Sequence, residues 1–179
     1  MYSPYIHMNQ TTKTMKKLII LALAFPSFLL GQSSLESKVL KELNKYRSQS
    51  SLRSLPYDAK ASAASRHHSS WVSLSGIISH VESKDIPNFQ ELKSIEDRNS
   101  FFKVEMFTEI VTIVSSNSFS GIPLSEDVIA ESAIKSFASS PKHDEIMKMF
   151  FREGIPVGAS VGVVRGKELA VVTINFVGL

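Results

Sequence analysis

The segment ASAASRHHSSWVSLSGIISH, residues 61–80, decides the fold that this sequence predicts. Its small and apolar residues recur every three or four positions, which is the spacing of one face of an α-helix. Asp58 is a suitable N-cap for this helix, and Gly76 is expected to end it. The alanines on the face leave room for another element to pack closely. The face consists of Ala61, Ala64, His68, Trp71, Val72 and Ser75.

Two histidines of this segment are candidates for a functional role. His68 lies near the middle of the apolar face, where a histidine is more often a buried, hydrogen-bonded core residue than a ligand. His80 lies just past the helix end, where its side chain can turn into a cleft. We therefore expect His80 to line a site, and His68 either to support that site or to fill the core.

A strand is expected over residues 104–114, which are rich in β-branched and aromatic side chains. Strict alternation places Glu109 on the same face as Val111, and Met106 on the opposite face with Ile110. A carboxylate beside large aliphatic side chains lies at the rim of the sheet or is paired, because burying it alone is costly. Glu109 is therefore a third candidate.

Further helices are expected on both sides of the strand. Ser125 and Ser140 are suitable N-caps, and Pro141 suits the first helical position. His143 falls in the first turn after Pro141, where the helix end lowers the pKa of the ring and favours its neutral form. The apolar series at helical spacing are Leu35, Val39, Leu43 and Tyr46, then Phe89, Leu92 and Ile95 within a short helix over residues 89–99, and Ile129, Ala130, Ala133, Ile134 and Phe137.

Residues 157–164 and 169–176 predict an antiparallel hairpin that turns over residues 165–168. The order is then two helices, a possible short helix, a strand, two helices and a hairpin. Helices on both faces of a small sheet would bury every apolar face. The predicted fold class is α+β, a three-layer α-β-α sandwich with a small, mostly antiparallel sheet.

Residues 1–31 resemble a secretory signal peptide followed by a single domain over residues 32–179. We expect translation to start at Met15, because Lys16 and Lys17 form a positive region before the apolar run Leu18–Leu30. That run is too short for a membrane span, although an anchor that stays uncleaved is the alternative. We expect a secreted or periplasmic protein with no span in the mature chain.

The composition excludes some classes of function. The formal net charge of +3 matches the three lysines of the leader, Lys13, Lys16 and Lys17, so the mature domain is neutral and gives no reason to expect a nucleic-acid partner. The chain contains no cysteine, which excludes a thiol nucleophile and thiolate metal sites.

Five segments, in order, carry a resemblance that covers roughly residues 35–178. The chain resembles a bacterial-type member of the CAP superfamily (the SCP domain), which includes cysteine-rich secretory proteins, antigen 5 and plant pathogenesis-related proteins. The segments are VLKELNKYRSQSSLRSLPYD (39–58), ASAASRHHSSWVSLSGIISH (61–80), TEIV (108–111), AIKSFASSPKHDEIM (133–147) and VGASVGVVRGKELAVVTINFVG (157–178).

The resemblance implies an α-β-α sandwich with a central groove that in many members holds two histidines and two acids. Carried over, the histidines are His80 and His143, and the first acid is Glu109. The second acid would fall near Ser140 and is absent, which leaves Glu131 as an uncertain substitute. Some members bind a divalent metal in the groove, and zinc held by the two histidines is the expected ion here.

Two functions follow from this resemblance. The preferred one is a secreted binding module for a lipid, glycan, peptide or partner protein. The alternative is a metal-assisted or acid/base hydrolase that uses His80, Glu109 and His143. Catalysis is the less favoured of the two, because no G-x-S-x-G or H-E-x-x-H motif is present.

Overall fold

The computed structural model describes residues 32–115, 124–149 and 157–178. The predicted leader, residues 1–31, lies outside the described residues, as does the expected boundary of its cleavage. None of the helices within the described ranges is long and apolar enough to cross a membrane.

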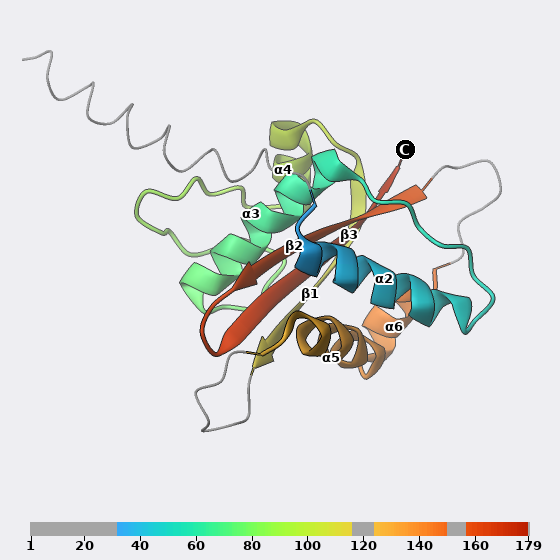
Figure 1. The fold of residues 1–179 in the computed structure, drawn as a ribbon. Coiled ribbons are helices and arrows are strands. Elements are labelled where there is room, and N and C mark those ends of the chain that lie inside the picture. The colour runs from blue at the N-terminus through green and yellow to red at the C-terminus, as the bar shows by residue number, and fades with distance from the viewer. Residues whose placement is uncertain (1–31, 116–123, 150–156, 179) are drawn as a thin grey trace, which may run out of the picture. The chain divides into compact units, whose positions relative to one another are not determined.

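The described strands form one antiparallel sheet (Figure 1). It consists of β1 (Met106–Ser115), β2 (Val157–Arg165) and β3 (Leu169–Gly178), in the order β1-β3-β2. β2 and β3 are the predicted hairpin, and the Gly166 N–H donates a hydrogen bond to the Leu169 carbonyl where the chain turns. The two strands joined by this short turn are therefore direct neighbours in the sheet.

Helices cover both faces of this sheet (Figure 1). One layer contains α2 (Ser34–Ser48), α5 (Glu126–Ala138) and α6 (Pro141–Met147). The other contains α3 (Ala59–Ser75) and α4 (Ile95–Phe102). The predicted three-layer α-β-α sandwich is confirmed.

Each layer buries its own cluster of side chains against the sheet. The cluster under α2 and α5 contains Leu43, Phe137, Ile174 and Phe176, all fully buried. On the other side, Trp71 and Val72 of α3 pack on Val111 and Val171 of the sheet. Burying a large apolar side chain contributes about 1.5–3 kcal/mol relative to leaving it in water, so these clusters provide most of the driving force for folding.

The limits of α3 agree with the caps read from the sequence. The Asp58 side chain accepts a hydrogen bond from the Ala61 N–H, and Gly76 ends the helix in the left-handed conformation (φ 71°). All the residues of the predicted face are buried. Glycine is favoured at this position because it adopts positive φ without strain.

Close packing between α3 and the sheet, expected from the small residues of α3, occurs at Gly162 of β2. A Cβ placed on Gly162 would lie 2.2 Å from the Ser65 carbonyl carbon and 2.2 Å from the Arg66 nitrogen. The Ser69 hydroxyl donates to the Gly162 carbonyl at 2.9 Å, and the Ser65 and Ser160 hydroxyls are 2.7 Å apart. Helix and strand therefore meet through backbone and hydroxyl groups.

The helix expected over residues 89–99 is wrong in its limits. α4 begins six residues later, because Ser94 and Asp97 form a capping box. The Ser94 hydroxyl accepts from the Asp97 N–H, and the Asp97 carboxylate accepts from the Ser94 N–H, both at 3.1 Å. Phe89 and Leu92 lie in the preceding loop, where Leu92 is nevertheless buried.

A register irregularity in β1 changes which way one side chain points. The pairing of β1 with β3 shifts between Met106 and Thr108. Met106 packs with Ala61 and Ala64 of α3, so its expected place on the face of Ile110 is wrong. Glu109 lies on the α3 side together with Val111, as the alternation predicts. Such a bulge re-aims neighbouring side chains, here next to Glu109.

The free edge of β2 is covered by the segment that leads into α3. The Ala159 N–H donates to the Pro56 carbonyl, and the Asp58 N–H donates to the Ala159 carbonyl, both at 2.9 Å. The Val161 N–H donates to the Ser62 hydroxyl at 3.2 Å. These bonds use backbone groups of β2 that an edge strand otherwise presents to solvent.

Candidate functional site

A pocket of about 350 Å³ opens where four chain segments meet. His80 and Val81 come from the segment after α3, and His143 comes from α6. The remaining lining residues belong to the start of α4 and to the irregular start of β1. The described lining residues are His80, Val81, Ser94, Ile95, Glu96, Phe107, Thr108, Glu109, Lys142, His143 and Ile146. The structure thus brings His80, Glu109 and His143 to one pocket.

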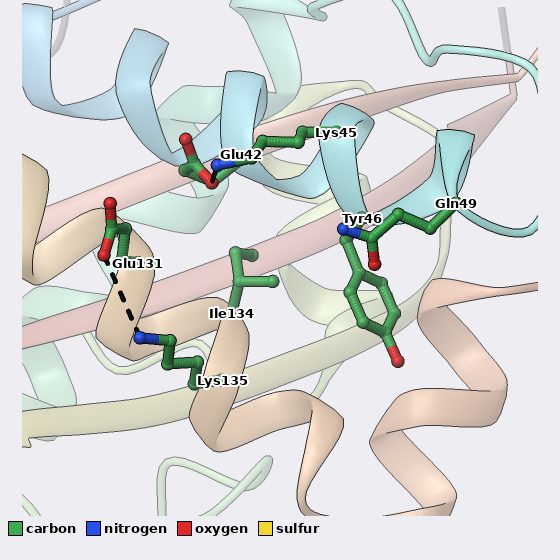
Figure 2. Close-up of a pocket in the computed structure, with 7 residues that line it drawn as sticks. All are labelled: Glu42, Lys45, Tyr46, Gln49, Glu131, Ile134 and Lys135. Atoms are coloured by element: carbon green, nitrogen blue, oxygen red, sulfur yellow. Dashed lines mark hydrogen bonds and ion pairs between the residues drawn. The ribbon is translucent and has the colours of Figure 1, made fainter.

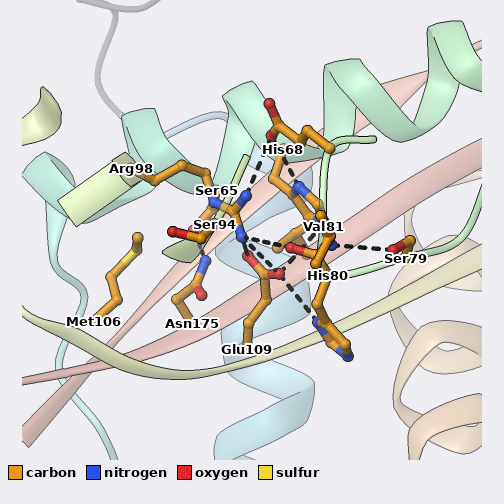
Figure 3. A network of polar contacts seen from close by, with 12 residues as sticks. Ser65, His68, Ser79, His80, Val81, Ser94, Arg98, Met106, Glu109 and Asn175 are labelled. Atoms are coloured by element: carbon orange, nitrogen blue, oxygen red, sulfur yellow. Dashed lines mark hydrogen bonds and ion pairs between the residues drawn. The ribbon is translucent and has the colours of Figure 1, made fainter. Parts of the chain in front are cut away.

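Glu109 is the carboxylate at the base of this pocket. Its side chain is only 3% exposed, whereas the His80 side chain is 54% exposed. The His80 Nδ1 atom lies 3.1 Å from the Glu109 Oε1 atom. Glu109 therefore fixes the orientation of a histidine that reaches into solvent (Figure 3).

The other partner of Glu109 is a buried arginine. The Arg98 Nη2 atom donates to both oxygens of Glu109, at 3.0 and 3.1 Å. Burial raises the pKa of Glu109, but the hydrogen bond from His80 and the charges of His68 and Arg98 outweigh this effect, so the pKa lies below its usual value. Glu109 is consequently an ionised acceptor whose charge is matched inside the protein.

A second buried carboxylate, Glu82, lies behind the first. It accepts from the Arg98 Nη1 atom at 3.3 Å and from the Leu92 N–H at 3.0 Å. Its other contacts are to the rings of His67 and His68, at 3.2 and 3.0 Å. Burial opposes ionisation of Glu82, but these hydrogen bonds lower its pKa to about 2. Arg98 therefore joins two buried carboxylates.

His68 lies between the two carboxylates and is not among the residues that line the pocket. It is fully buried, with Nδ1 at 3.0 Å from Glu82 and Nε2 at 3.3 Å from Glu109. Its ring stacks on that of Trp71 at a centroid distance of 6.0 Å. The reading of His68 as a buried, hydrogen-bonded residue is therefore the correct one, and its contacts with Glu82 and Glu109 place it directly behind the pocket.

His143 lines the pocket from the first turn of α6. Its ring makes an edge-to-face contact with Phe137, with the centroids 5.6 Å apart. Burial lowers the pKa of His143, and the charges of His80 and Lys142 lower it further. The direction agrees with the expectation of a neutral ring, but burial, rather than the helix end, is its main cause.

The structure does not bring Glu131 to this pocket. It lies on α5 and lines a different pocket, between α2 and α5, together with Glu42, Lys45 and Tyr46 (Figure 2). Its carboxylate is 3.9 Å from the Lys135 ammonium. The prediction that Glu131 takes the place of the second acid of the site is therefore wrong, because Glu131 lines a different pocket.

The residues present do not form a complete metal site. Among the described residues, no three histidine, aspartate or glutamate side chains are arranged to hold an ion. Glu109 is a poor third ligand beside His80 and His143, because the Arg98 guanidinium already binds both of its oxygens. Structural zinc sites use four protein ligands and catalytic ones three, whereas this pocket offers two imidazoles.

Three residues of the buried network, His67, Glu82 and Arg98, were not found from the sequence. Arg98 could have been found, because the pattern Ser94-x-x-Asp97 is a capping box that starts a helix at residue 95. In that register Ile95, Arg98 and Phe102 share one face, which points inward. Glu82 lies in a loop, and no local pattern distinguishes it from an exposed carboxylate.

No protein-family model matches this sequence, and no curated protein matches it. Similar solved structures are found at low identity. An extracellular protein containing an SCP domain from Bacillus anthracis has a TM-score of 0.52 and 16% identity over 94% of this chain. The match covers 45% of that protein, so this chain spans less than half of its length.

An outer surface protein of Borrelia burgdorferi has a TM-score of 0.52 and 12% identity, with 96% of each chain covered. At sequence identities this low, the two matches show a similarity of fold alone. The order of elements and the layers agree with the resemblance read from the sequence. The protein therefore has an SCP-like fold, the fold of the CAP superfamily.

Proposed function

We propose that the protein is a secreted or surface-exposed binding module that holds its ligand in the pocket of His80, Glu109 and His143. The observation that carries the proposal is the convergence of separate chain segments on one open pocket of about 350 Å³. Small-molecule sites typically measure roughly 300–1,000 Å³ and combine apolar walls with a few convergent polar groups. This pocket has both kinds of lining.

The location outside the cell is supported by two observations. Residues 1–31 have the pattern of a secretory leader. The two similar solved structures are described as extracellular and as an outer surface protein. The partner is an extracellular lipid, glycan, peptide or protein.

A thermal-shift screen tests the proposal. A ligand that binds the folded state raises the melting temperature, by an amount set by its concentration relative to Kd. We expect a hit from a panel of glycans, lipids and peptides to stabilise the wild type and Glu131→Ala, whose substitution lies in the other pocket, but not His143→Ala. The proposal would be contradicted if no compound of the panel raised the melting temperature of the wild type, or if every hit raised that of the wild type and both variants equally.

A hydrolase is the alternative function, and one observation favours it. The Glu109 carboxylate orients His80 through a 3.1 Å hydrogen bond, as a general base requires. A positioned base contributes about 10²–10⁴-fold to a rate. His80→Ala should therefore abolish any turnover of chromogenic esters or amides. Equal turnover in the wild type and His80→Ala would exclude His80 as the base.

Zinc binding by His80 and His143 stays a prediction from the family resemblance. Calorimetric titration of zinc into the wild type should then give heat that is lost in both His80→Ala and His143→Ala. Identical heats in the three proteins would end this prediction without affecting the binding of an organic ligand.

A further inference from the structure

The contacts that hold the Glu109 carboxylate determine which ring nitrogen of His80 carries a hydrogen. Both oxygens of Glu109 accept from the Arg98 guanidinium, and Oε1 also faces His80 Nδ1. An ionised carboxylate has only acceptor oxygens. The hydrogen in the His80–Glu109 contact must therefore be carried by His80 Nδ1.

A neutral imidazole has one N–H and one bare nitrogen. In the neutral form of His80, Nδ1 carries the hydrogen, so Nε2 is the bare nitrogen and accepts hydrogen bonds. The His80 side chain is 54% exposed and lines the pocket. His80 therefore offers the ligand an acceptor, and its best partner is a hydroxyl or amide donor.

The charges of the pocket do not favour a charged ligand. Among the described lining residues, the charged side chains are Glu96, Glu109 and Lys142. Arg98 matches Glu109, and Glu96 and Lys142 have opposite signs. These groups carry no excess of positive charge, so the pocket as a whole does not attract a carboxylate or phosphate ligand, and burying a charge without a partner is costly.

The remaining lining is amphipathic. Val81 and Phe107, which are 50% and 48% exposed, form apolar walls together with Ile95. Ser94 and Thr108 add hydroxyl groups that both donate and accept hydrogen bonds. This combination suits a ring that has C–H faces and hydroxyl edges.

We propose that the pocket binds an uncharged, hydroxyl-bearing ligand of the size of a short saccharide, and that His80 Nε2 accepts a hydrogen bond from one ligand hydroxyl. Arg98 and Glu109 are positioning residues for this contact, since Arg98 holds the Glu109 carboxylate and Glu109 holds the His80 ring. The inference rests on the proposed function and narrows its ligand class to one.

The first test is the tautomer of His80, measured in the full-length protein by nitrogen-15 NMR of the histidine side chains at neutral pH. We expect Nδ1 of His80 to carry the proton and Nε2 to show the shift of a bare nitrogen. Glu109→Gln should produce a mixture of tautomers, because an amide both donates and accepts. A His80 ring with its proton on Nε2 in the wild type overturns the inference.

The second test is an NMR titration with two uncharged disaccharides, cellobiose and N,N′-diacetylchitobiose, alongside sodium decanoate and glucuronic acid as anionic probes. We expect a disaccharide to shift His80 Nε2 in the wild type and in Glu131→Ala, and His80→Phe to weaken binding three- to tenfold, the range for one lost neutral hydrogen bond. His80→Gln, which keeps an acceptor, should recover part of the affinity.

The outcomes separate the inference from the proposed function. Binding of only the anionic probes at this pocket would refute the uncharged ligand but keep the binding function. Binding of a disaccharide with equal affinity in the wild type, His80→Phe and His80→Gln would refute the role of Nε2. If neither the disaccharides nor the broader panel of glycans, lipids and peptides bind, the inference and the proposed function both fail.

Discussion

Arg98 is the residue on which the site depends most. Its guanidinium group contacts Glu82 and Glu109 at once and is fully buried. A lysine could neutralise one carboxylate, but only the planar fork of an arginine reaches two on different elements. The position of His80 therefore depends on a side chain of α4, which does not itself line the pocket.

The first prediction concerns the loss of this guanidinium. Arg98→Met should reduce the free energy of unfolding by about 3–5 kcal/mol, because it leaves two buried carboxylates without their shared cation. The free energy of unfolding of Arg98→Lys should lie between that of Arg98→Met and that of the wild type. Urea unfolding measures both, and Arg165→Met, at an exposed position, serves as the control with a change of about 0.5 kcal/mol or less. If Arg98→Met unfolds at the same urea concentration as the wild type, the ion pairs of Arg98 with Glu82 and Glu109 contribute nothing to stability.

The second prediction is an acid sensitivity set by Glu82. Its pKa is lowered from 4.5 to about 2 in the folded protein, so it stabilises the fold fully above about pH 4.5. This contribution, on the order of 3 kcal/mol, is lost as the pH falls from about 4.5 towards 2, because the unfolded chain binds the proton more readily. Urea unfolding at a series of pH values should show the loss.

The control for the acid sensitivity is Glu82→Gln. This variant cannot titrate, so its stability should fall less steeply below pH 4.5 than that of the wild type, whatever its absolute stability. Glu145→Gln, at an exposed position of α6, should keep the wild-type slope. Parallel curves for Glu82→Gln and the wild type would contradict the assignment.

At the scale of the elements, the contact between α3 and β2 positions His68. Gly162 lets the helix backbone approach the strand so closely that a methyl group would lie within 2.2 Å of backbone atoms. The backbone of α3 would have to move to admit it. Movement of α3 would carry His68 away from Glu109, which lies on β1.

The third prediction follows from this contact. Gly162→Ala should destabilise the protein by about 3 kcal/mol, at the upper end of the range for overpacking, because the clash is with backbone atoms. Gly166→Ala is the matched control, since the nearest atom to an added Cβ there is 3.4 Å away. Thermal unfolding distinguishes the two variants, and equal melting temperatures would mean that α3 can shift at little cost.

The elements also show what could be predicted from the sequence. Ser125 and Asp58 cap helices where the sequence placed them, and the hairpin of β2 and β3 has its predicted turn, because these features depend on neighbouring residues. The position of α4 differs from the prediction because the spacing of Phe89, Leu92 and Ile95 indicates an earlier start than the one set by the capping box at Ser94.

The buried network could not be predicted in the same way. Glu82, Arg98 and Glu109 come from a loop, a helix and a strand, and nothing in the local sequence of one identifies the others. The irregular pairing at Met106 is also decided by distant contacts, here with Ala61 and Ala64. His80, Glu109 and His143 were located through a family resemblance, which carries spatial information that periodicity lacks.

At the scale of the whole molecule, a buried ion pair connects helices of the two outer layers. The Arg66 guanidinium of α3 donates to both oxygens of Glu36 on α2, at 2.6 and 2.7 Å. Glu36 is 1% exposed and also caps the first turn of α2 with Ser33. A bidentate pair with low exposure is far stronger than an ordinary surface pair.

The fourth prediction compares two glutamates of α2. Glu36→Gln should cost about 3 kcal/mol, because it leaves a mostly buried guanidinium without its carboxylate partner while keeping the shape of the side chain. Glu42→Gln breaks a more exposed pair with Lys45 and should change the free energy of unfolding much less, because water screens that pair. Denaturant unfolding of both variants measures the difference. If the two variants lose similar amounts of stability, the pair with Arg66 contributes little and Glu36 acts only as a helix cap.

The segment Pro56–Asp58 and the hydroxyl of Ser62 occupy backbone groups of Ala159 and Val161 along the outer side of β2. A strand from a second copy of the chain would have to displace this cover before it could extend the sheet there. The same residues lead directly into α3, so stripping them away would loosen the helix that carries His68. Polymerisation through this side of the molecule is thus coupled to loss of the pocket, and a protein with an intact pocket is protected against it.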